Sequence, residues 1–195
     1  ANERAIKVTA PTLFRSANER AIKVTAPNFE LRPECEPTPP GPSDRIAGYA
    51  YHSCVIQTDT SVKCWGYNGF GGLGNGSTTN SATPVPVSGL TGAATVSTGG
   101  HHTCALILDG SIKCWGTNAY GQLGNGSKVD AAIPVFVSGL AGAVAVSAGN
   151  GFTCAIASDA SVRCWGSNDH GQLGDGTMKA RTAPYKVPLN EKVVY

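Results

Sequence analysis

The chain has 195 residues, of which 25 are glycine, 41% are hydrophobic and 14% are charged. This hydrophobic share excludes a disordered polymer, and a glycine share far below one third excludes a collagen-like triple helix. The net charge of +2 comes from scattered side chains, which excludes the concentrated basic stripe that binds nucleic acid. No apolar run approaches the roughly 18 residues of a membrane helix. Many glycines and few charges indicate an all-β protein of short strands and turns.

Residues 1–44 are predicted to form an extended N-terminal segment, in which one 11-residue sequence occurs twice, at 1–11 and at 17–27. Its Ala-Ile-Lys-Val-Thr-Ala core alternates apolar and polar residues as a half-buried strand does, and a proline ends each copy. We expect both copies to add as strands to sheet edges, at least one of them on a neighbouring subunit. The alternative is a disordered tail whose duplication is accidental. The apolar residues of the two predicted strands are Ile6, Val8, Ile22 and Val24.

A proline-rich tether at 33–42 completes this segment and contains Cys35. Proline-rich chain is extended and has little further structure of its own. Cys35 stands apart from the other six cysteines, which recur in pairs. In an oxidising compartment an odd cysteine forms an intermolecular disulfide or remains a free thiol, and the sequence leaves both open.

A single unit is repeated three times in the rest of the chain, residues 45–195. Each copy has two cysteines ten residues apart, then Trp-Gly, an asparagine, a Gly-x-Leu-Gly element and a proline, and the copies are 50 residues apart. The copies run at about 45–94, 95–144 and 145–195. A period of this length is longer than a leucine-rich repeat, and helical repeats do not tolerate so much glycine.

The strand pattern within a copy predicts a propeller blade. In the middle copy, alternating apolar and β-branched residues predict four strands. They lie at about 94–97, 103–108, 111–115 and 134–137. Four short strands in a period of about 50 residues is typical of a β-propeller blade. The predicted fold is therefore all-β, with three blades of four antiparallel strands. Three blades are too few to close a ring, and an open stack exposes an apolar face at each end.

The sequence at 104–126, Cys-Ala-Leu-Ile-Leu-Asp-Gly-Ser-Ile-Lys-Cys-Trp-Gly-Thr-Asn-Ala-Tyr-Gly-Gln-Leu-Gly-Asn-Gly, resembles the regulator of chromosome condensation repeat. It is most similar to the cysteine-containing bacterial and extracellular variants, and the resemblance covers about residues 45–195. The resemblance implies a β-propeller, usually of seven blades. The member that gave the family its name exchanges nucleotide on a small GTPase and binds chromatin, but this chain has no basic nucleosome-contacting tail and no recognisable exchange loop. The resemblance therefore implies the fold and not the activity.

The cysteine pairs flank short hairpins. In the middle copy a three-residue loop at 108–110, with Gly110 in the left-handed position, pairs residue 107 with 111 and hence Cys104 with Cys114. Such a pair has Cα atoms about 4.5 Å apart, near the short end of the disulfide range. Buried thiols are the alternative, whereas two thiolates across a hairpin match no common zinc pattern. Three disulfides imply an extracellular or cell-surface location. The expected pairs are Cys54–Cys64, Cys104–Cys114 and Cys154–Cys164.

No residue pattern supports an enzyme, a metal site or a cofactor. The sequence lacks Gly-x-Ser-x-Gly, His-Glu-x-x-His, a phosphate loop and a dinucleotide fingerprint. His52 and His102 occupy equivalent positions where the third copy has Phe152, so the position accepts an aromatic ring and we expect no metal there. The tryptophan of each copy fits blade packing, with a sugar-stacking platform as the alternative. We predict no catalytic residue.

Two functional hypotheses remain. The first is a non-enzymatic extracellular structural protein that assembles into a homo-oligomer or fibre by N-terminal strand donation. The alternative is a protein-binding propeller module of the adhesin, receptor or inhibitor type, in which aromatic anchors gather on one face. Tyr67, Phe70 and Tyr120 lie in equivalent loops and are the predicted binding face. The expected partners are further copies of the chain or another protein, without nucleic acid or a membrane span.

Overall fold

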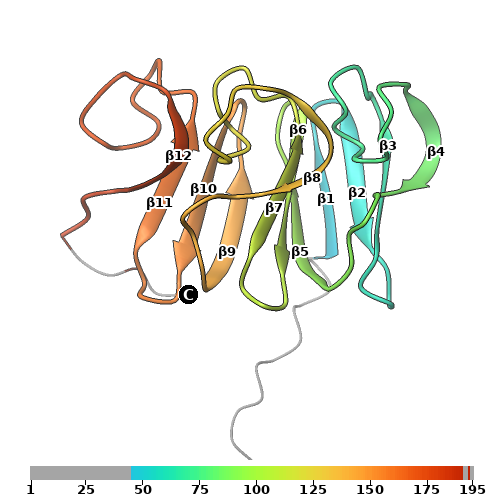
Figure 1. Cartoon of the computed structure of the whole chain (residues 1–195), viewed down its shortest axis with the longest axis horizontal. Helices are drawn as coiled ribbons and strands as arrows, with labels where there is room; N and C mark the ends of the chain where they lie inside the picture. Colours follow the sequence, from blue (N-terminus) through green and yellow to red (C-terminus); the bar gives the residue numbers. More distant parts are fainter. Residues whose placement is uncertain (1–44, 191–192, 194–195) are drawn as a thin grey trace, which may run out of the picture. The chain divides into compact units, whose positions relative to one another are not determined.

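Three four-stranded antiparallel sheets contain all the strands of the described part of the chain (Figure 1). They are seen in a computed structural model that describes residues 45–190 and residue 193. Each sheet is formed by four strands that are consecutive in the sequence, so each sheet is one blade. The all-β prediction and the propeller-type blades are confirmed. Within the described residues no helix is long and apolar enough to cross a membrane.

The twelve strands recur with the period of the sequence. The first blade has β1 (Ile46–Tyr49), β2 (His52–Ile56), β3 (Val62–Gly66) and β4 (Ser81–Pro86). The second has β5 (Ala93–Thr98), β6 (His102–Ile107), β7 (Ile112–Gly116) and β8 (Ala131–Phe136). The third has β9 (Ala143–Ala148), β10 (Phe152–Ala157), β11 (Val162–Gly166) and β12 (Arg181–Lys186).

The fourth strand of the middle blade begins at Ala131, three residues before its predicted start. A register shift after Cys114 lets Gly116 pair with Ala131. A Cβ atom on Gly116 would clash with the His101 carbonyl oxygen, so glycine is required at this bulge. β8 lies at the edge of the sheet, with Ile133 and Phe136 exposed and no residue fully buried, and an edge strand lacks the apolar alternation that identifies a buried strand. Proline within β8 fits the same position because it donates no ladder hydrogen bond.

The hairpin between β6 and β7 has the predicted turn. Ile107 N–H donates to the Ser111 carbonyl at 2.8 Å, and Gly110, with φ 79°, donates to the Ile107 carbonyl at 2.9 Å. The Asp109 carboxylate accepts from Ser111 N at 2.8 Å. A glycine in the left-handed conformation and an aspartate side chain that accepts from the backbone N–H two residues later are the local features that make this turn form.

The hydrophobic core lies between the blades. One cluster joins Cys54, Ile56 and Val62 of the first blade to Ala105 and Trp115 of the second. A second cluster repeats this arrangement between the second and third blades. The first strands of neighbouring blades also contact each other, so they line the inner side of the array and the fourth strands its outer side. The blade junctions therefore supply most of the packing.

Candidate functional site

Each blade contains one disulfide across its central hairpin: Cys54–Cys64, Cys104–Cys114 and Cys154–Cys164. The pairing predicted from the hairpin register is thus present in the structure. The two Cα atoms are 4.1 Å apart in all three bonds, slightly closer than expected for a non-hydrogen-bonded pair. The first two disulfides lie in the blade junctions, whereas Cys154 of the third is partly exposed.

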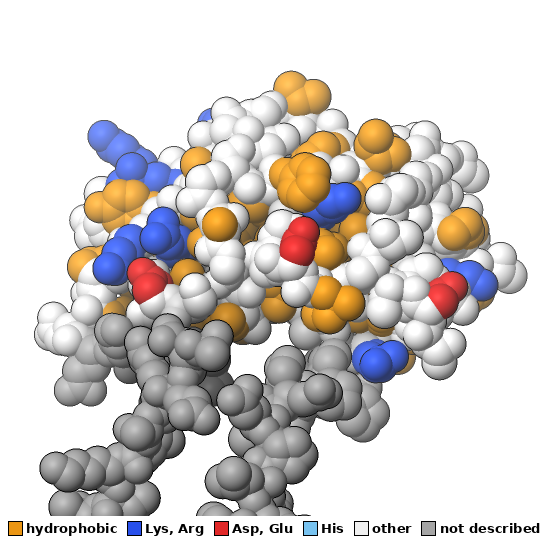
Figure 2. Space-filling view, turned by 60° about the horizontal axis from the view of Figure 1, so that its bottom comes forward, with side chains coloured by type: hydrophobic (Ala, Val, Ile, Leu, Met, Phe, Trp, Pro, Cys, Tyr) orange, Lys and Arg blue, Asp and Glu red, His pale blue; other side chains and the backbone are white. Residues whose placement is uncertain are grey.

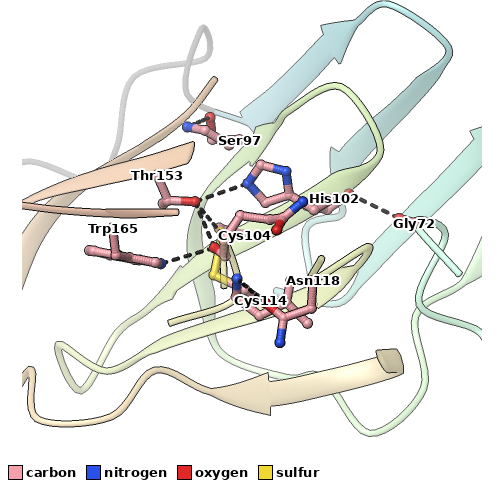
Figure 3. Close-up of a disulfide and its surroundings, with 12 residues drawn as sticks. Gly72, Ser97, His102, Cys104, Cys114, Asn118, Thr153 and Trp165 are labelled. Atoms are coloured by element: carbon pink, nitrogen blue, oxygen red, sulfur yellow. Dashed lines mark hydrogen bonds between the residues drawn. A yellow bond between two sulfur atoms is a disulfide. The ribbon is translucent and has the colours of Figure 1, made fainter. Parts of the chain in front are cut away.

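The junction between the second and third blades is built around the carbonyl oxygen of Gln122, in the glycine-rich loop of the second blade. Figure 3 shows Thr153 and Trp165 of the third blade beside His102 and Cys104 of the second. The Thr153 hydroxyl and the Trp165 indole N–H, both from the third blade, donate to this oxygen at 2.9 Å each. The same hydroxyl lies 2.9 Å from His102 Nε2 and 3.9 Å from Cys104 Sγ. Because its hydrogen points to the carbonyl, the threonine accepts from the histidine ring. One hydroxyl therefore connects the loop, the histidine and the disulfide of the preceding blade.

The junction between the first and second blades repeats this geometry. Thr103 Oγ1 and Trp115 Nε1 donate to the Gly72 carbonyl at 2.9 and 2.8 Å. His52 Nε2 lies 2.7 Å from the Thr103 hydroxyl. The third blade has Phe152 at the histidine position, which cannot make this hydrogen bond. The tryptophans therefore pack the blades and are not arranged as a sugar-stacking platform at these two junctions.

Both junction histidines are neutral at physiological pH. Burial, with a smaller contribution from the neighbouring His101, lowers the pKa of His52 from 6.5 to about 4. Burial likewise lowers the pKa of His102 to about 3, with His52 and His101 as smaller causes. A neutral ring that donates through Nε2 is a structural hydrogen-bond donor. Among the described residues no three His, Cys, Asp or Glu side chains are grouped so that they could hold a metal ion.

The repeated asparagine organises the long loop of each blade, a role that the sequence analysis did not assign. In the middle blade the Asn118 side-chain oxygen accepts from Leu123 N at 2.9 Å. Its amide nitrogen donates to the carbonyls of Ser127 and Val129 at 3.0 and 3.1 Å. Asn118 is fully buried, so these bonds satisfy a side chain that water does not reach. The asparagine thereby fixes the loop that carries the Gln122 carbonyl.

Four ring side chains form a surface cluster where the loops of the first two blades meet: Tyr51, Tyr67, Phe70 and His101. Tyr51 stacks on His101 with ring centroids 5.0 Å apart and planes 3° apart. Phe70 and Tyr67 lie 5.1 and 5.4 Å from the same imidazole. His101 therefore lies at the centre of the cluster, and three of the four rings come from the first blade. We refer to these four residues as the aromatic cluster.

The aromatic cluster exposes a large part of its ring surface. Tyr51 is 61% exposed, Phe70 40% and Tyr67 38%. The face turned forward in Figure 2 differs from it, because hydrophobic side chains there lie as separate spots among acidic and basic ones. Contacting rings with exposed faces can anchor a partner with little loss of side-chain entropy.

The structure separates the predicted binding residues. Tyr67 and Phe70 lie together, with centroids 6.2 Å apart. Tyr120 occupies the equivalent loop of the second blade, beside Gly151, where a glycine replaces the ring that His101 supplies to the aromatic cluster. Tyr51 and His101 were missed by sequence reasoning, although their spacing of one repeat period was a usable signal. The predicted strand residues Ile6, Val8, Ile22 and Val24, and Cys35, lie outside the described residues.

The sheets, the junctions and the disulfide hairpins together define a β-propeller repeat protein. The Regulator of chromosome condensation (RCC1) repeat matches residues 61–106, 109–156 and 159–195, and a second form of the same repeat matches 93–122 and 143–172. The chain belongs to the RCC1 repeat family, as its resemblance in sequence implied. None of the curated proteins compared with the chain matches it.

Solved structures show the same fold. The crystal structure of human WBSCR16 superposes with a TM-score of 0.69 at 21% identity, over 77% of this chain and 40% of that one. Yeast RCC1 (Prp20) bound to Kap60 gives 0.67 at 18% identity, over 74% and 37%. Prp20p from Saccharomyces cerevisiae, described with its binding to Gsp1p and histones, gives 0.67 at 19%, over 74% and 38%. The chain thus spans about two fifths of the length of these structures.

Proposed function

We propose that this chain is a non-enzymatic protein-binding propeller module and that the aromatic cluster is its binding surface. The observation that carries the proposal is the set of four contacting rings around His101, of which Tyr51, Phe70 and Tyr67 are between 38% and 61% exposed. Interface hot spots are enriched in such aromatic anchors. Prp20, with the same fold, is described as bound to Kap60 and as binding Gsp1p and histones, which is consistent with a protein partner here.

A selection from random displayed peptides tests the proposed surface. The peptides are selected on the oxidised full chain, and their affinity is measured for Tyr51→Ser and Phe70→Ser variants. We expect affinity to fall at least about tenfold, because loss of one anchor ring costs more than about 1.4 kcal/mol. Tyr120→Ser is the matched control, since Tyr120 is 48% exposed in the equivalent loop of the next blade. Peptides that bind all three variants equally would show that the aromatic cluster is not the site.

We also propose an extracellular or cell-surface location. The three hairpin disulfides support it, because such bonds persist in oxidising compartments and are rare in the reducing cytosol. Expression in the bacterial periplasm should give a folded chain with one titratable thiol, that of Cys35, or none if Cys35 forms an intermolecular bond. An equally stable chain recovered from a reducing cytosol with seven free thiols would contradict the proposal.

Self-assembly by strand donation is the second candidate function. The duplicated 11-residue sequence supports it, because alternating apolar residues suit addition to an exposed edge strand, and the described fourth strands offer such edges. Deletion of residues 1–27 should abolish the assembly of the full chain, as measured by sedimentation velocity. Assembly that persists in the truncated chain would reject strand donation.

A further inference from the structure

The long loop of each of the first two blades contains the sequence Asn-Gly-Ser, at residues 75–77 and 125–127. Asn-x-Ser, with x other than proline, is the acceptor sequence for N-linked carbohydrate, which is carried on the surface of secreted proteins. The third blade has Asp-Gly-Thr at the equivalent residues 175–177. An asparagine and an aspartate can therefore be compared at the same place in the same loop.

The side-chain oxygen of each of these asparagines faces the loop. Asn75 Oδ1 accepts from Ser77 N at 3.1 Å and from Asn68 Nδ2 at 3.3 Å. Asn125 Oδ1 repeats the two bonds with the equivalent partners, at 3.1 and 3.2 Å. Because both partners are donors, the atom that they contact is the amide oxygen, and the amide nitrogen takes the other position. The buried asparagine that organises the loop thus also orients the asparagine of the acceptor sequence.

The aspartate of the third blade makes the same bonds through one oxygen and is closed off at the other. Asp175 Oδ1 accepts from Thr177 N at 2.9 Å and from Asn168 Nδ2 at 3.0 Å. Its Oδ2, which takes the place of the amide nitrogen, accepts from Arg181 Nε and Nη2 at 2.8 and 2.7 Å. The Asp175 side chain is 0% exposed. In the third blade an arginine therefore occupies the space beside this atom.

The same space is open in the first two blades, because Ser81 and Ala131 stand at the arginine position. Both side chains are too short to take the place of the guanidinium group. Asn75 and Asn125 are partly exposed. Among the described residues neither Nδ2 atom makes a hydrogen bond, and neither is a buried polar atom without a partner. Water therefore reaches both amide nitrogens.

The backbone beside each asparagine is anchored to the next blade. Gly76 N donates to the Ala132 carbonyl, and Gly126 N donates to the Thr182 carbonyl, each at 2.9 Å. Figure 1 shows the loops that join β3 to β4 and β7 to β8 on the same side of the blade array. The two amide nitrogens thus lie at fixed points of equivalent loops, one blade apart.

We propose that Asn75 and Asn125 are acceptor sites for N-linked glycosylation. The donor is an oligosaccharide linked to a polyprenyl diphosphate, and an oligosaccharyl transferase catalyses the step. The amide nitrogen forms a bond to the anomeric carbon of the first sugar and loses one proton, while the bond from that carbon to the diphosphate oxygen breaks and the diphosphate leaves with the electron pair. The glycosylated amide keeps its oxygen, so both hydrogen bonds within the loop remain. The inference rests on the extracellular location proposed above.

Secretion from a eukaryotic cell tests the two sites. The full chain is expressed in cultured mammalian cells behind a cleavable secretion signal, and its intact mass is measured before and after treatment with peptide N-glycosidase. This enzyme hydrolyses the glycosylated amide and leaves aspartate. In heavy-oxygen water the new aspartates carry a label that peptide mass spectrometry locates. We expect loss of two glycans on treatment, with labelled aspartate at positions 75 and 125.

Substitutions assign each glycan to its asparagine. Asn75→Asp and Asn125→Asp should each remove one glycan and keep the fold, because Asp175 occupies the equivalent position. Asn80→Asp is the matched control and should keep both glycans. Asn80 is an exposed asparagine of the same loop outside the acceptor sequence, and the second blade has Asp130 in its place. Alanine at both acceptor serines should remove both glycans while the asparagines remain.

The outcomes separate this inference from the proposed location. A secreted chain with three disulfides and a mass that peptide N-glycosidase leaves unchanged would overturn the inference and leave the extracellular location supported. Glycans that persist in the double variant Asn75→Asp, Asn125→Asp would also overturn it, because they would be attached elsewhere. A secreted chain whose hairpin cysteines remain free thiols would instead contradict the location, whether or not the chain carries carbohydrate.

Discussion

The middle blade and the two end blades have nearly the same sequence pattern but different surroundings. Neighbouring blades cover both faces of the middle blade, and its Trp115, Cys104 and Cys114 are fully buried. The first blade leaves Trp65 partly exposed on one face, and the third leaves Ile156 partly exposed on the other. The comparison shows that all three blades have the same four-stranded sheet, whereas their apolar residues are fully buried only where a neighbouring blade covers them.

The largest expected difference in stability between the blades is that between alanine substitutions of their tryptophans. Trp115→Ala should destabilise the chain by about 3–5 kcal/mol, because it leaves a cavity in a closed junction and removes a donor to the Gly72 carbonyl. Trp65→Ala should cost less than about 2 kcal/mol at low protein concentration, since its face is open there. Urea unfolding of both variants measures the difference. Equal losses at low concentration would mean that the two positions are equally covered in the monomer.

Removal of a disulfide should reveal a smaller difference in stability between the middle blade and the third. Replacing either pair by alanine removes a link between residues ten apart, which costs roughly 2–3 kcal/mol in the chain-entropy description. The Cys104–Cys114 pair should cost about 1 kcal/mol more than the Cys154–Cys164 pair, because it also packs within a closed junction. Unfolding midpoints of the two double variants give the comparison. A larger loss at the third blade would contradict it.

Acid should lower the stability of the chain through a histidine in each of the first two blades, which the third blade lacks. The pKa of His52 is about 4 and that of His102 about 3 in the folded chain, against 6.5 when unfolded. As pH falls below 6.5 the unfolded state binds protons that the folded state excludes, so stability is lost from pH 6.5 down to about 4 through His52 and down to about 3 through His102. Each histidine should contribute on the order of 3–5 kcal/mol to this loss.

The chain itself offers the control for this pH dependence, because the third blade has Phe152 at the same position. The double variant His52→Phe, His102→Phe should flatten the stability profile between pH 6.5 and 4. His170→Phe, at an exposed loop position, should leave the profile unchanged. Asp59, Asp109 and Asp159 have pKa values lowered by hydrogen bonds to serine, so their effect falls below this range. A steep profile in the double variant would assign the acid sensitivity to other groups.

Features that depend on neighbours in sequence could be predicted, and those that join two blades could not. The turn at Gly110 and the Cys104–Cys114 pairing follow from ten residues of local pattern. The His52–Thr103 contact joins residues 51 apart, and no propensity or motif identifies such a partner. The edge strand β8 was predicted too short for a related reason, since its exposed face gives no alternating pattern. The repeat period was the one signal that could have placed blade-to-blade partners.

The smallest expected effect concerns the hairpin turn, in which the blades differ by one residue. Gly110 has φ 79° in the middle blade, whereas Ala160 in the third holds the same left-handed conformation with φ 62°. A side chain makes this conformation unfavourable by roughly 1 kcal/mol, and glycine partly offsets the gain through its greater freedom when unfolded. Ala160→Gly should therefore raise stability by about 0.5 kcal/mol, visible as a higher urea midpoint with an unchanged slope. Gly110→Ala should lower stability by about 1 kcal/mol or more, because its Cβ would also lie 3.0 Å from the Gly142 Cα. If both substitutions left the midpoint unchanged, the turn conformation would not limit the stability of either blade.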